Sequence, residues 1–161
     1  MNTVEYLDSF EKYLLDVKHA STNTLSSYKR DVKRYLSFLE NRGISPCHAG
    51  KDTISLFYNS LKAEGKSSAS VSRAVASIRS FYNYLVYSGK CNSNPADAVT
   101  TEKCTRKIPD VLSGEEVDLL LSQPDTTDSK GIRDKAMLEV LYATGIRVSE
   151  LIALNETDVN L

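Results

Sequence analysis

Hydrophobic residues in the first 88 positions recur at the three-to-four-residue spacing of amphipathic helices. Helices are expected over about residues 3–17, 21–41, 51–64 and 68–87, each followed by a glycine or a polar turn. Their apolar stripes predict a compact four-helix bundle with its own core. The stripes comprise Val4, Leu7, Phe10, Leu14 and Leu15, then Leu25, Tyr28, Val32, Tyr35, Leu36 and Leu39, then Ile54, Phe57 (or Tyr58) and Leu61, and finally Val71, Val75, Ile78, Tyr82 and Leu85.

The second and fourth helices each carry a polar face that is rich in serine and arginine and nearly free of acidic residues. Small side chains let another backbone come close, and hydroxyl and guanidinium groups suit phosphate oxygens. The same composition fits a helix that packs on another helix, but the match between the two faces favours phosphate contact. The faces comprise Asn23, Ser26, Arg30, Arg34 and Ser37, flanked by Lys29 and Lys33, and Ala69, Arg73, Ala76, Ser77 and Ser80, beside Ser72 and Arg79.

After this bundle the pattern changes. Residues 89–112 have few periodic apolar positions, which predicts a linker whose middle is basic through Lys103, Arg106 and Lys107. A capping box, Ser113-x-x-Glu116, opens a short helix, and a second helix over about residues 130–144 is apolar on more than one side. We therefore expect that second helix to be central and buried. Alternation over residues 157–161 predicts the beginning of a β-strand.

The longer of these two helices is expected to end at Gly145, with a new helix starting at about Arg147. A cation in a first helical turn faces the positive end of the helix dipole and is unfavourable there. It is favourable if a phosphate supplies the negative charge, because both the free N–H groups and the guanidinium can hold it. The alternative is an ordinary ion pair between Arg147 and Glu150, three residues on.

The net charge of −1 hides an uneven distribution. Residues 18–42 carry six Lys/Arg against two acidic residues, and residues 62–90 carry five against one, a balance of +4 in each. Residues 110–161 carry four basic residues against eleven acidic ones, a balance of −7. Two basic segments in one part of the chain are typical of a polyanion-binding surface, although charge runs are often only solvated faces.

Cysteine usage and hydropathy indicate in which cellular compartment the protein is found. The three cysteines, Cys47, Cys91 and Cys104, are odd in number and lack C-x-x-C spacing, so we expect reduced thiols and no metal site. The N-terminus lacks a secretion signal, and no apolar run approaches the roughly 18 residues of a membrane span. These features predict a cytoplasmic protein.

Three stretches resemble one family, the tyrosine recombinases, which are phage-integrase and Xer-like site-specific DNA recombinases. Residues 143–151, ATGIRVSEL, resemble the family's ATG-[LIM]-R-[VI]-S-E-L box. The first domain is similar to the family's core-binding domain through Thr24-Leu25-x-x-Tyr28-x-x-Asp31-Val32-x-x-Tyr35-x-x-Phe38-Leu39 and Ser77-Ile78-Arg79-Ser80-Phe81-Tyr82-x-Tyr84-Leu85. Asn94-Pro95-Ala96 and Pro109-x-x-Leu112-Ser113 resemble the join between the two recombinase domains.

The resemblance implies a mainly α fold: a SAM-like core-binding bundle over residues 1–88, a linker over 89–112, and the first helices and strand of a truncated α+β catalytic domain over 113–161. It implies a DNA strand transferase that needs no cofactor or metal and binds double-stranded DNA, the full-length protein acting as a tetramer on two DNA sites. Arg147 would be the first catalytic arginine and Glu150 a supporting residue. The DNA-binding residues would be Ser26, Arg30, Lys33, Arg34, Arg73, Ser77, Ser80, Lys103, Arg106 and Lys107.

The family's later catalytic residues, a Lys, a His-x-x-Arg, a further His or Trp and a Tyr nucleophile, have no match here. His19 and His48 lack an Arg three residues on. None of the nine tyrosines is expected to be the nucleophile, and five of them fit core or stripe positions: Tyr6, Tyr28, Tyr35, Tyr82 and Tyr142. We therefore expect an N-terminal fragment that binds DNA without cleaving it. A DNA-binding module that never catalyses and a helical protein-interaction adaptor remain the alternatives.

Overall fold

The computed structural model describes residues 3–100 and 110–158. The chain divides into two compact units, Met1–Arg106 and Lys107–Leu161, so the division falls within the predicted linker. The described residues of both units form helices, turns and loops, with no β-strand among them. None of the described helices has the length and apolar character needed to cross a lipid bilayer.

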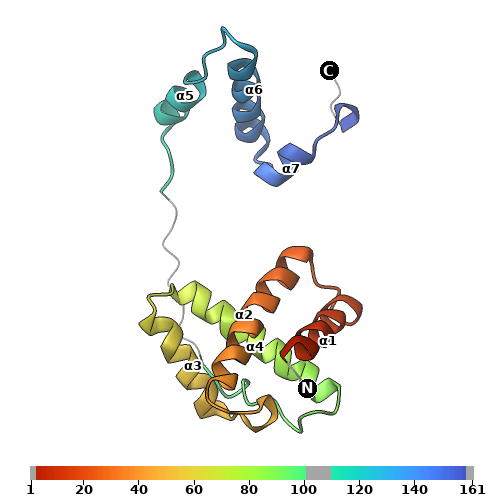
Figure 1. Cartoon of the computed structure of the whole chain (residues 1–161). Coiled ribbons are helices and arrows are strands. Elements are labelled where there is room, and N and C mark those ends of the chain that lie inside the picture. The colour runs from red at the N-terminus through yellow and green to blue at the C-terminus, as the bar shows by residue number, and fades with distance from the viewer. Residues whose placement is uncertain (1–2, 101–109, 159–161) are drawn as a thin grey trace. The chain divides into compact units, whose positions relative to one another are not determined.

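The described residues of the first unit form four helices: α1 (Thr3–Asp16), α2 (Thr22–Glu40), α3 (Lys51–Ala63) and α4 (Ser68–Tyr87). Their bounds confirm the four predicted helices to within a residue or two, and a 3-10 turn, η1 (Pro46–His48), precedes α3. In Figure 1, α2 and α4 cross at the centre of the unit, with α1 packed against α2 and α3 against α4. The α2–α4 crossing is thus the central contact of the bundle.

Local chemistry fixes where these helices begin and end. The Ser21 hydroxyl accepts the N–H of Thr24 at 3.4 Å, and the Ser67 hydroxyl accepts that of Ser70 at 3.3 Å. Each bond satisfies one of the free N–H groups of a helix start. After α2, Gly43 has a φ of 64°, a left-handed conformation that a residue with a Cβ adopts only with strain.

The core of the first unit is aromatic and lies between α1, α2, α3 and α4. It contains the predicted stripes of α3 and α4, most of that of α2, and residues of α4 that the pattern had not placed there. Leu25 and Tyr28 of the α2 stripe are only partly buried, and Val4 and Leu15 of the α1 stripe are exposed. Phe10 and Phe81 meet edge to face with ring centroids 5.5 Å apart, a favourable geometry for two rings. The additional buried residues of α4 are Ala74, Ser77, Phe81 and Tyr84.

Two buried tyrosines join α2, α4 and η1. The hydroxyls of Tyr35 and Tyr82 lie 2.9 Å apart, and Tyr82 donates its proton to the Pro46 carbonyl oxygen at 3.0 Å. Tyr35 must therefore be the donor to Tyr82, so the bonds run in one direction from α2 to η1. Burial raises the pKa of Tyr35 to about 12 and raises that of Tyr82 as well, which keeps both phenols protonated.

The direction of this chain predicts unequal effects of two similar substitutions. Tyr82→Phe leaves both the Tyr35 hydroxyl and the Pro46 carbonyl without a partner and should lower the free energy of unfolding by about 1–3 kcal/mol. Tyr35→Phe keeps the Tyr82–Pro46 bond and should cost about 0.5–1.5 kcal/mol. Urea unfolding of both variants measures the difference, and equal losses would contradict the assigned direction.

The segment after α4 packs onto the first unit instead of leaving it at Gly89. Ala96 and Val99 are buried, and the Arg79 guanidinium donates to their carbonyl oxygens at 3.3 and 3.1 Å. Arg79 also pairs with Asp97. This corrects two expectations: the free linker does not start at residue 89, and Arg79, placed beside the polar face of α4, holds the chain end of its own unit.

The second unit contains α5 (Gly114–Ser122), α6 (Ser129–Thr144), α7 (Val148–Ala153) and the 3-10 turn η2 (Glu156–Asp158). The predicted capping box is present: Ser113 N–H donates to Glu116 Oε2 at 2.7 Å, and Glu116 N–H donates to Ser113 Oγ at 3.3 Å. The strand predicted over 157–161 is not formed at Thr157 and Asp158, which lie in η2, and its remaining residues lie outside the described ones.

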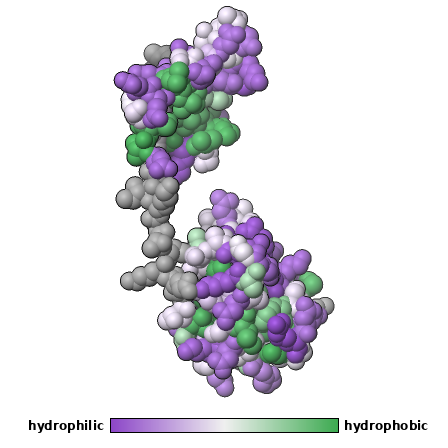
Figure 2. All heavy atoms as spheres, turned by 90° about the vertical axis from the view of Figure 1, so that its left-hand side faces the viewer, coloured by the Kyte–Doolittle hydropathy of each residue, from purple (hydrophilic) through white to green (hydrophobic). Residues whose placement is uncertain are grey.

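Helix α6 is not buried as predicted. Among the described residues of the second unit only Gly131 of α6 is buried, and Ile132 is 56% and Tyr142 64% exposed. Figure 2 shows hydrophobic atoms gathered over one face of this unit. The apolar sides of α6 were predicted to be buried by packing partners, and the described helices α5 and α7 are too short to cover them. Exposed residues of the unit include Val111, Leu112, Leu119, Leu120, Ile132, Met137, Val140, Tyr142, Val148, Ile152 and Leu154.

Candidate functional site

The predicted polar face of α2 is largely exposed. Arg30, Lys33 and Ser26 are exposed, and no hydrogen bond or ion pair to another described residue engages the charged groups of Arg30 and Lys33. The Ser26 hydroxyl donates to the Thr22 carbonyl within its own helix at 2.9 Å. Arg34 forms an exposed ion pair with Glu64, the residue that follows α3. The flanking Lys29 pairs with Glu11, so the α2 face offers two unengaged cations and two paired ones.

Of the three residues of α4 predicted to bind DNA, Arg73, Ser77 and Ser80, one is not where the prediction placed it. Arg73 remains exposed, with 41% of its side chain accessible, although its guanidinium is bonded to Asp31. Ser80 is half-buried. Ser77 is fully buried, so the expectation that it faces DNA is wrong. Its hydroxyl lies 3.1 Å from Asp31 Oδ2 and 3.0 Å from the Arg73 carbonyl oxygen, which ties it to the α2–α4 contact.

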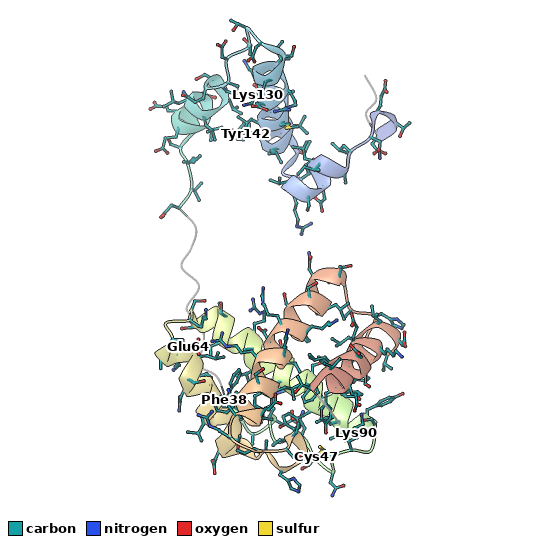
Figure 3. The ribbon with its side chains drawn as sticks, in the orientation of Figure 1. Phe38, Cys47, Glu64, Lys90, Lys130 and Tyr142 are labelled. Carbon is teal, nitrogen blue, oxygen red and sulfur yellow. The ribbon has the colours of Figure 1, made fainter. Side chains whose placement is uncertain are left out.

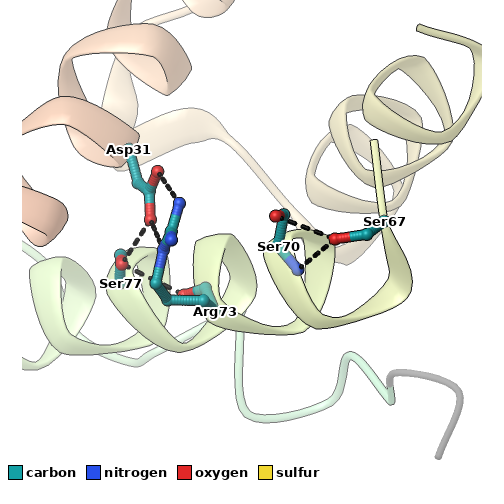
Figure 4. Close-up of polar contacts among 5 residues, drawn as sticks. All are labelled: Asp31, Ser67, Ser70, Arg73 and Ser77. Carbon is teal, nitrogen blue, oxygen red and sulfur yellow. Dashed lines mark hydrogen bonds and ion pairs between the residues drawn. The ribbon is translucent and has the colours of Figure 1, made fainter. Parts of the chain in front are cut away.

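Asp31 is the residue that the pattern of the sequence did not single out. It is only 8% exposed, and its carboxylate accepts Arg73 Nε at 3.0 Å and a terminal nitrogen of Arg73 at 3.3 Å (Figure 4). The helical spacing could have predicted its burial, because Asp31 lies three residues after Tyr28 and four before Tyr35 on the apolar stripe. A carboxylate there needs a partner from the facing helix.

A cleft of about 420 Å³ brings several of these groups together. It is formed by α2, α3, α4 and the turn before α4, and four cationic side chains line it against the single carboxylate of Asp31. Such a concave basic surface attracts an anion and focuses its field better than scattered surface lysines do. The lining residues are Arg30, Asp31, Arg34, Phe57, Leu61, Lys66, Ser70, Arg73 and Ala74.

The basic linker residues Lys103, Arg106 and Lys107 lie outside the described residues, and so does Cys104. Their predicted contact with DNA stays a prediction. Cys47 and Cys91 carry free thiols 2.9 Å apart, beside Lys90 at one end of the bundle (Figure 3). Burial raises the pKa of Cys91, which keeps that thiol protonated. Within the described ranges, no group of three or more metal-ligating side chains is assembled.

The predicted turn between α6 and α7 has the expected geometry. Gly145 has a φ of 66° and ends α6, and α7 begins at once. Arg147 is the residue before the first turn of α7, not a member of that turn as predicted. Its side chain is 81% exposed, so the guanidinium is presented to solvent at a fixed place in the turn.

Glu150 already supplies the counter-charge at this turn. Its carboxylate accepts the Arg147 backbone N–H at 2.8 Å and a terminal guanidinium nitrogen of Arg147 at 2.7 Å. A guanidinium has no lone pair to return the bond, so only half of a capping box is formed. The ordinary ion pair is thus the arrangement observed. Because the pair is exposed and leaves other guanidinium N–H groups free, it does not prevent Arg147 from binding a phosphate.

The two bonds lower the pKa of Glu150 below 4.5, the backbone N–H of Arg147 being the larger cause and its side chain the second. A lowered folded-state pKa stabilises the turn above the unfolded-state value, and this contribution is lost as the pH falls through the folded-state pKa. We expect Arg147→Ala to raise the pKa of Glu150 part of the way to 4.5, because the backbone bond remains. NMR titration of the side-chain carboxyl carbons measures this.

Glu116 is the matched control for that titration. Its pKa is lowered by the backbone N–H and side chain of Ser113, far along the chain from Arg147. Arg147→Ala should leave it unchanged. A Glu150 pKa that does not move in the variant would show that the guanidinium contact is absent in solution.

Two family models match this chain. Residues 7–89 match the phage integrase N-terminal SAM-like domain, and residues 110–161 match the phage integrase family. The chain belongs to the phage integrase family, the tyrosine recombinases. The first match covers α2 and α4 with their basic cleft, and the second covers the Gly145–Arg147 turn.

Curated relatives agree with this assignment. The chain is 44% identical over 152 residues to a protein of Caldanaerobacter subterraneus named as a tyrosine recombinase, covering 94% of this chain and 52% of the relative. It is 39% identical over 159 residues to tyrosine recombinase XerD of Listeria innocua, covering 98% and 54%. The crystal structure of XerA recombinase is similar with a TM-score of 0.51 at 27% identity, covering 99% of this chain and 53% of that one. The chain thus spans about half the length of the curated relatives it matches.

Proposed function

We propose that the first unit is a core-binding domain that grips double-stranded DNA with α2 and α4, and that the second unit supplies Arg147 to the phosphate site of a site-specific recombinase. The observation that carries the proposal is the clustering of Arg30, Arg34, Lys66 and Arg73 around one cleft on the helices that match the SAM-like domain. Such a cleft suits the phosphates of the DNA backbone, because their negative charge attracts Lys and Arg side chains whatever the base sequence.

The reaction of the whole enzyme would be strand exchange through a covalent intermediate. A tyrosine oxygen bonds to the scissile phosphorus, the bond to the 5′ oxygen breaks, and that oxygen leaves as a hydroxyl after taking a proton. The guanidinium of Arg147 would stabilise the negative charge that builds up on the non-bridging phosphate oxygens. Glu150 would orient it through the contact described above. A cytoplasmic enzyme working as a tetramer on two DNA sites, without metal or cofactor, is part of the same proposal.

The tyrosines of the first unit's core do not suit the role of the nucleophile. Tyr35 and Tyr82 are buried, bonded to each other and to Pro46, and have raised pKa values. Tyr142, assigned to a core position from the pattern, is 64% exposed and is the tyrosine of the second unit. We propose that these 161 residues alone bind DNA without cleaving it.

A suicide substrate tests that proposal. A nicked duplex traps any enzyme that joins a tyrosine to the scissile phosphate, because the short strand released by cleavage diffuses away. We expect no covalent adduct of this chain on a denaturing gel, while a full-length relative forms one on its own site. An adduct with this chain that disappears in Tyr142→Phe would contradict the assignment and identify the nucleophile.

DNA binding itself is tested by fluorescence anisotropy of a labelled duplex over a range of salt concentrations. We expect affinity to fall steeply with salt, and Arg30→Ala to weaken binding and to reduce the slope of log K against log salt by about 1, as the loss of one phosphate contact does. Thermal stability of this variant should be unchanged, since no described residue bonds to the Arg30 guanidinium.

Glu64→Gln should have the opposite effect on DNA affinity to Arg30→Ala. It removes the carboxylate that pairs with Arg34 and should strengthen binding, because it frees a cation for a phosphate. If the unaltered chain binds no duplex at low salt, the helical protein-interaction alternative replaces the DNA-binding proposal.

A further inference from the structure

We propose that Asp31 is a positioning residue: it holds the Arg73 guanidinium at the wall of the basic cleft so that its free edge binds one phosphate of the DNA backbone. This inference rests on the proposed DNA-binding function. It assigns a backbone phosphate to the basic cleft as its ligand, and it gives Asp31 the role of holding the arginine that binds this phosphate. At first sight an acid in a DNA-binding face is unfavourable, since it repels phosphate. The geometry of the contact instead indicates that Asp31 favours phosphate binding.

Asp31 is almost withdrawn from solvent. It is 8% exposed, and its two oxygens receive two guanidinium N–H groups, while the Ser77 hydroxyl lies 3.1 Å from one of them. A buried carboxylate bonded in this way has little field left for a ligand outside, because its charge is compensated by the bonded groups. Its main effect is to fix the plane and direction of the guanidinium (Figure 4).

The pairing uses only part of Arg73. A guanidinium has five N–H donors in a rigid plane, and the two that point to Asp31 belong to Nε and one terminal nitrogen. Three donors remain, and 41% of the side chain is accessible. An arginine whose fork is fixed on one side binds a phosphate with less loss of side-chain freedom than a mobile one does.

The rest of the cleft suits a single phosphate. Arg73 lines it together with Arg30, Arg34 and Lys66, so the bound group would meet cations from α2, from α4 and from the turn between α3 and α4. Ser70 adds a hydroxyl from the first turn of α4, where it is held 3.0 Å from the Ser67 hydroxyl. Arg30 has no partner among the described residues, and the Arg34 partner, Glu64, is exposed. The cleft is therefore assembled around the fixed guanidinium.

The two possible roles of Asp31 predict opposite effects of Asp31→Asn on DNA affinity. If it only neutralises Arg73, then Asp31→Asn removes a negative charge and strengthens DNA binding. If it positions Arg73, then Asp31→Asn releases the guanidinium, and we expect about tenfold weaker binding with a salt slope smaller by about 1. Asp8→Asn is the control, because Asp8 is an exposed acid on α1 and its loss changes the charge equally. It should leave affinity unchanged or slightly higher.

A double-mutant cycle separates positioning from a general loss of structure. Asp31→Asn, Arg73→Ala and the double variant are measured by anisotropy with the same duplex, at a temperature where circular dichroism shows each folded. We expect Asp31→Asn to weaken binding only when Arg73 is present. Equal weakening in both backgrounds, or tighter binding of Asp31→Asn, would overturn the proposal.

Arg73→Lys tests the inference if Asp31→Asn does not fold. Lysine keeps the charge and one bond to Asp31 but lacks the planar fork, so we expect a loss of about tenfold, as for Asp31→Asn. Wild-type affinity in this variant would refute the role of the fixed guanidinium. An unaltered chain that binds no duplex would instead refute the underlying DNA-binding proposal, so the two failures are distinguishable.

Discussion

The first unit depends on how α2 and α4 cross, and that crossing contains a buried carboxylate. Asp31 can stay in the interior because Arg73 and Ser77 reach it, and leaving a buried polar group without its partner generally costs about 1–3 kcal/mol. The need to satisfy this charge fixes the axial register of the two helices more narrowly than apolar packing alone would. About one turn further along α2, the Tyr35–Tyr82–Pro46 chain has the same effect. The polar faces of the two helices are consequently held in a defined relation.

Periodicity and capping residues were enough to find the helices. Ser21, Ser67 and Ser113 accept N–H groups as their position before an apolar run predicts, and Gly145 adopts the left-handed conformation expected at the end of α6. These signals succeed because they depend on the nearest few residues. The assignment of the family from the ATGIRVSEL box succeeded for the same reason, since that box is a local turn with a distinct composition.

Two of the residues that the pattern misplaced, Ser77 and Arg79, have partners far along the chain. Ser77 lies on the helical face shared with Arg73, yet the bond to Asp31, 46 residues away, draws it into the core. Arg79 is drawn to the carbonyls of Ala96 and Val99. For α6 the error has another cause: an apolar surface indicates that a helix prefers a partner, but the partner must be supplied by other elements. Arg147 and Glu150 were correctly paired as the simpler alternative because they are three residues apart.

Because Arg79 anchors residues 94–99, it also limits the length of chain that can span the distance between the two units. Had the chain left the first unit at Gly89, the ten residues from 90 to 99 would have added up to about 35 Å to the span available between the two units, at roughly 3.5 Å for each extended residue. Fastening them shortens the tether, and a shorter tether raises the effective concentration of one unit near a ligand held by the other. The contacts of one guanidinium thus shorten the stretch of chain that is free between the two units.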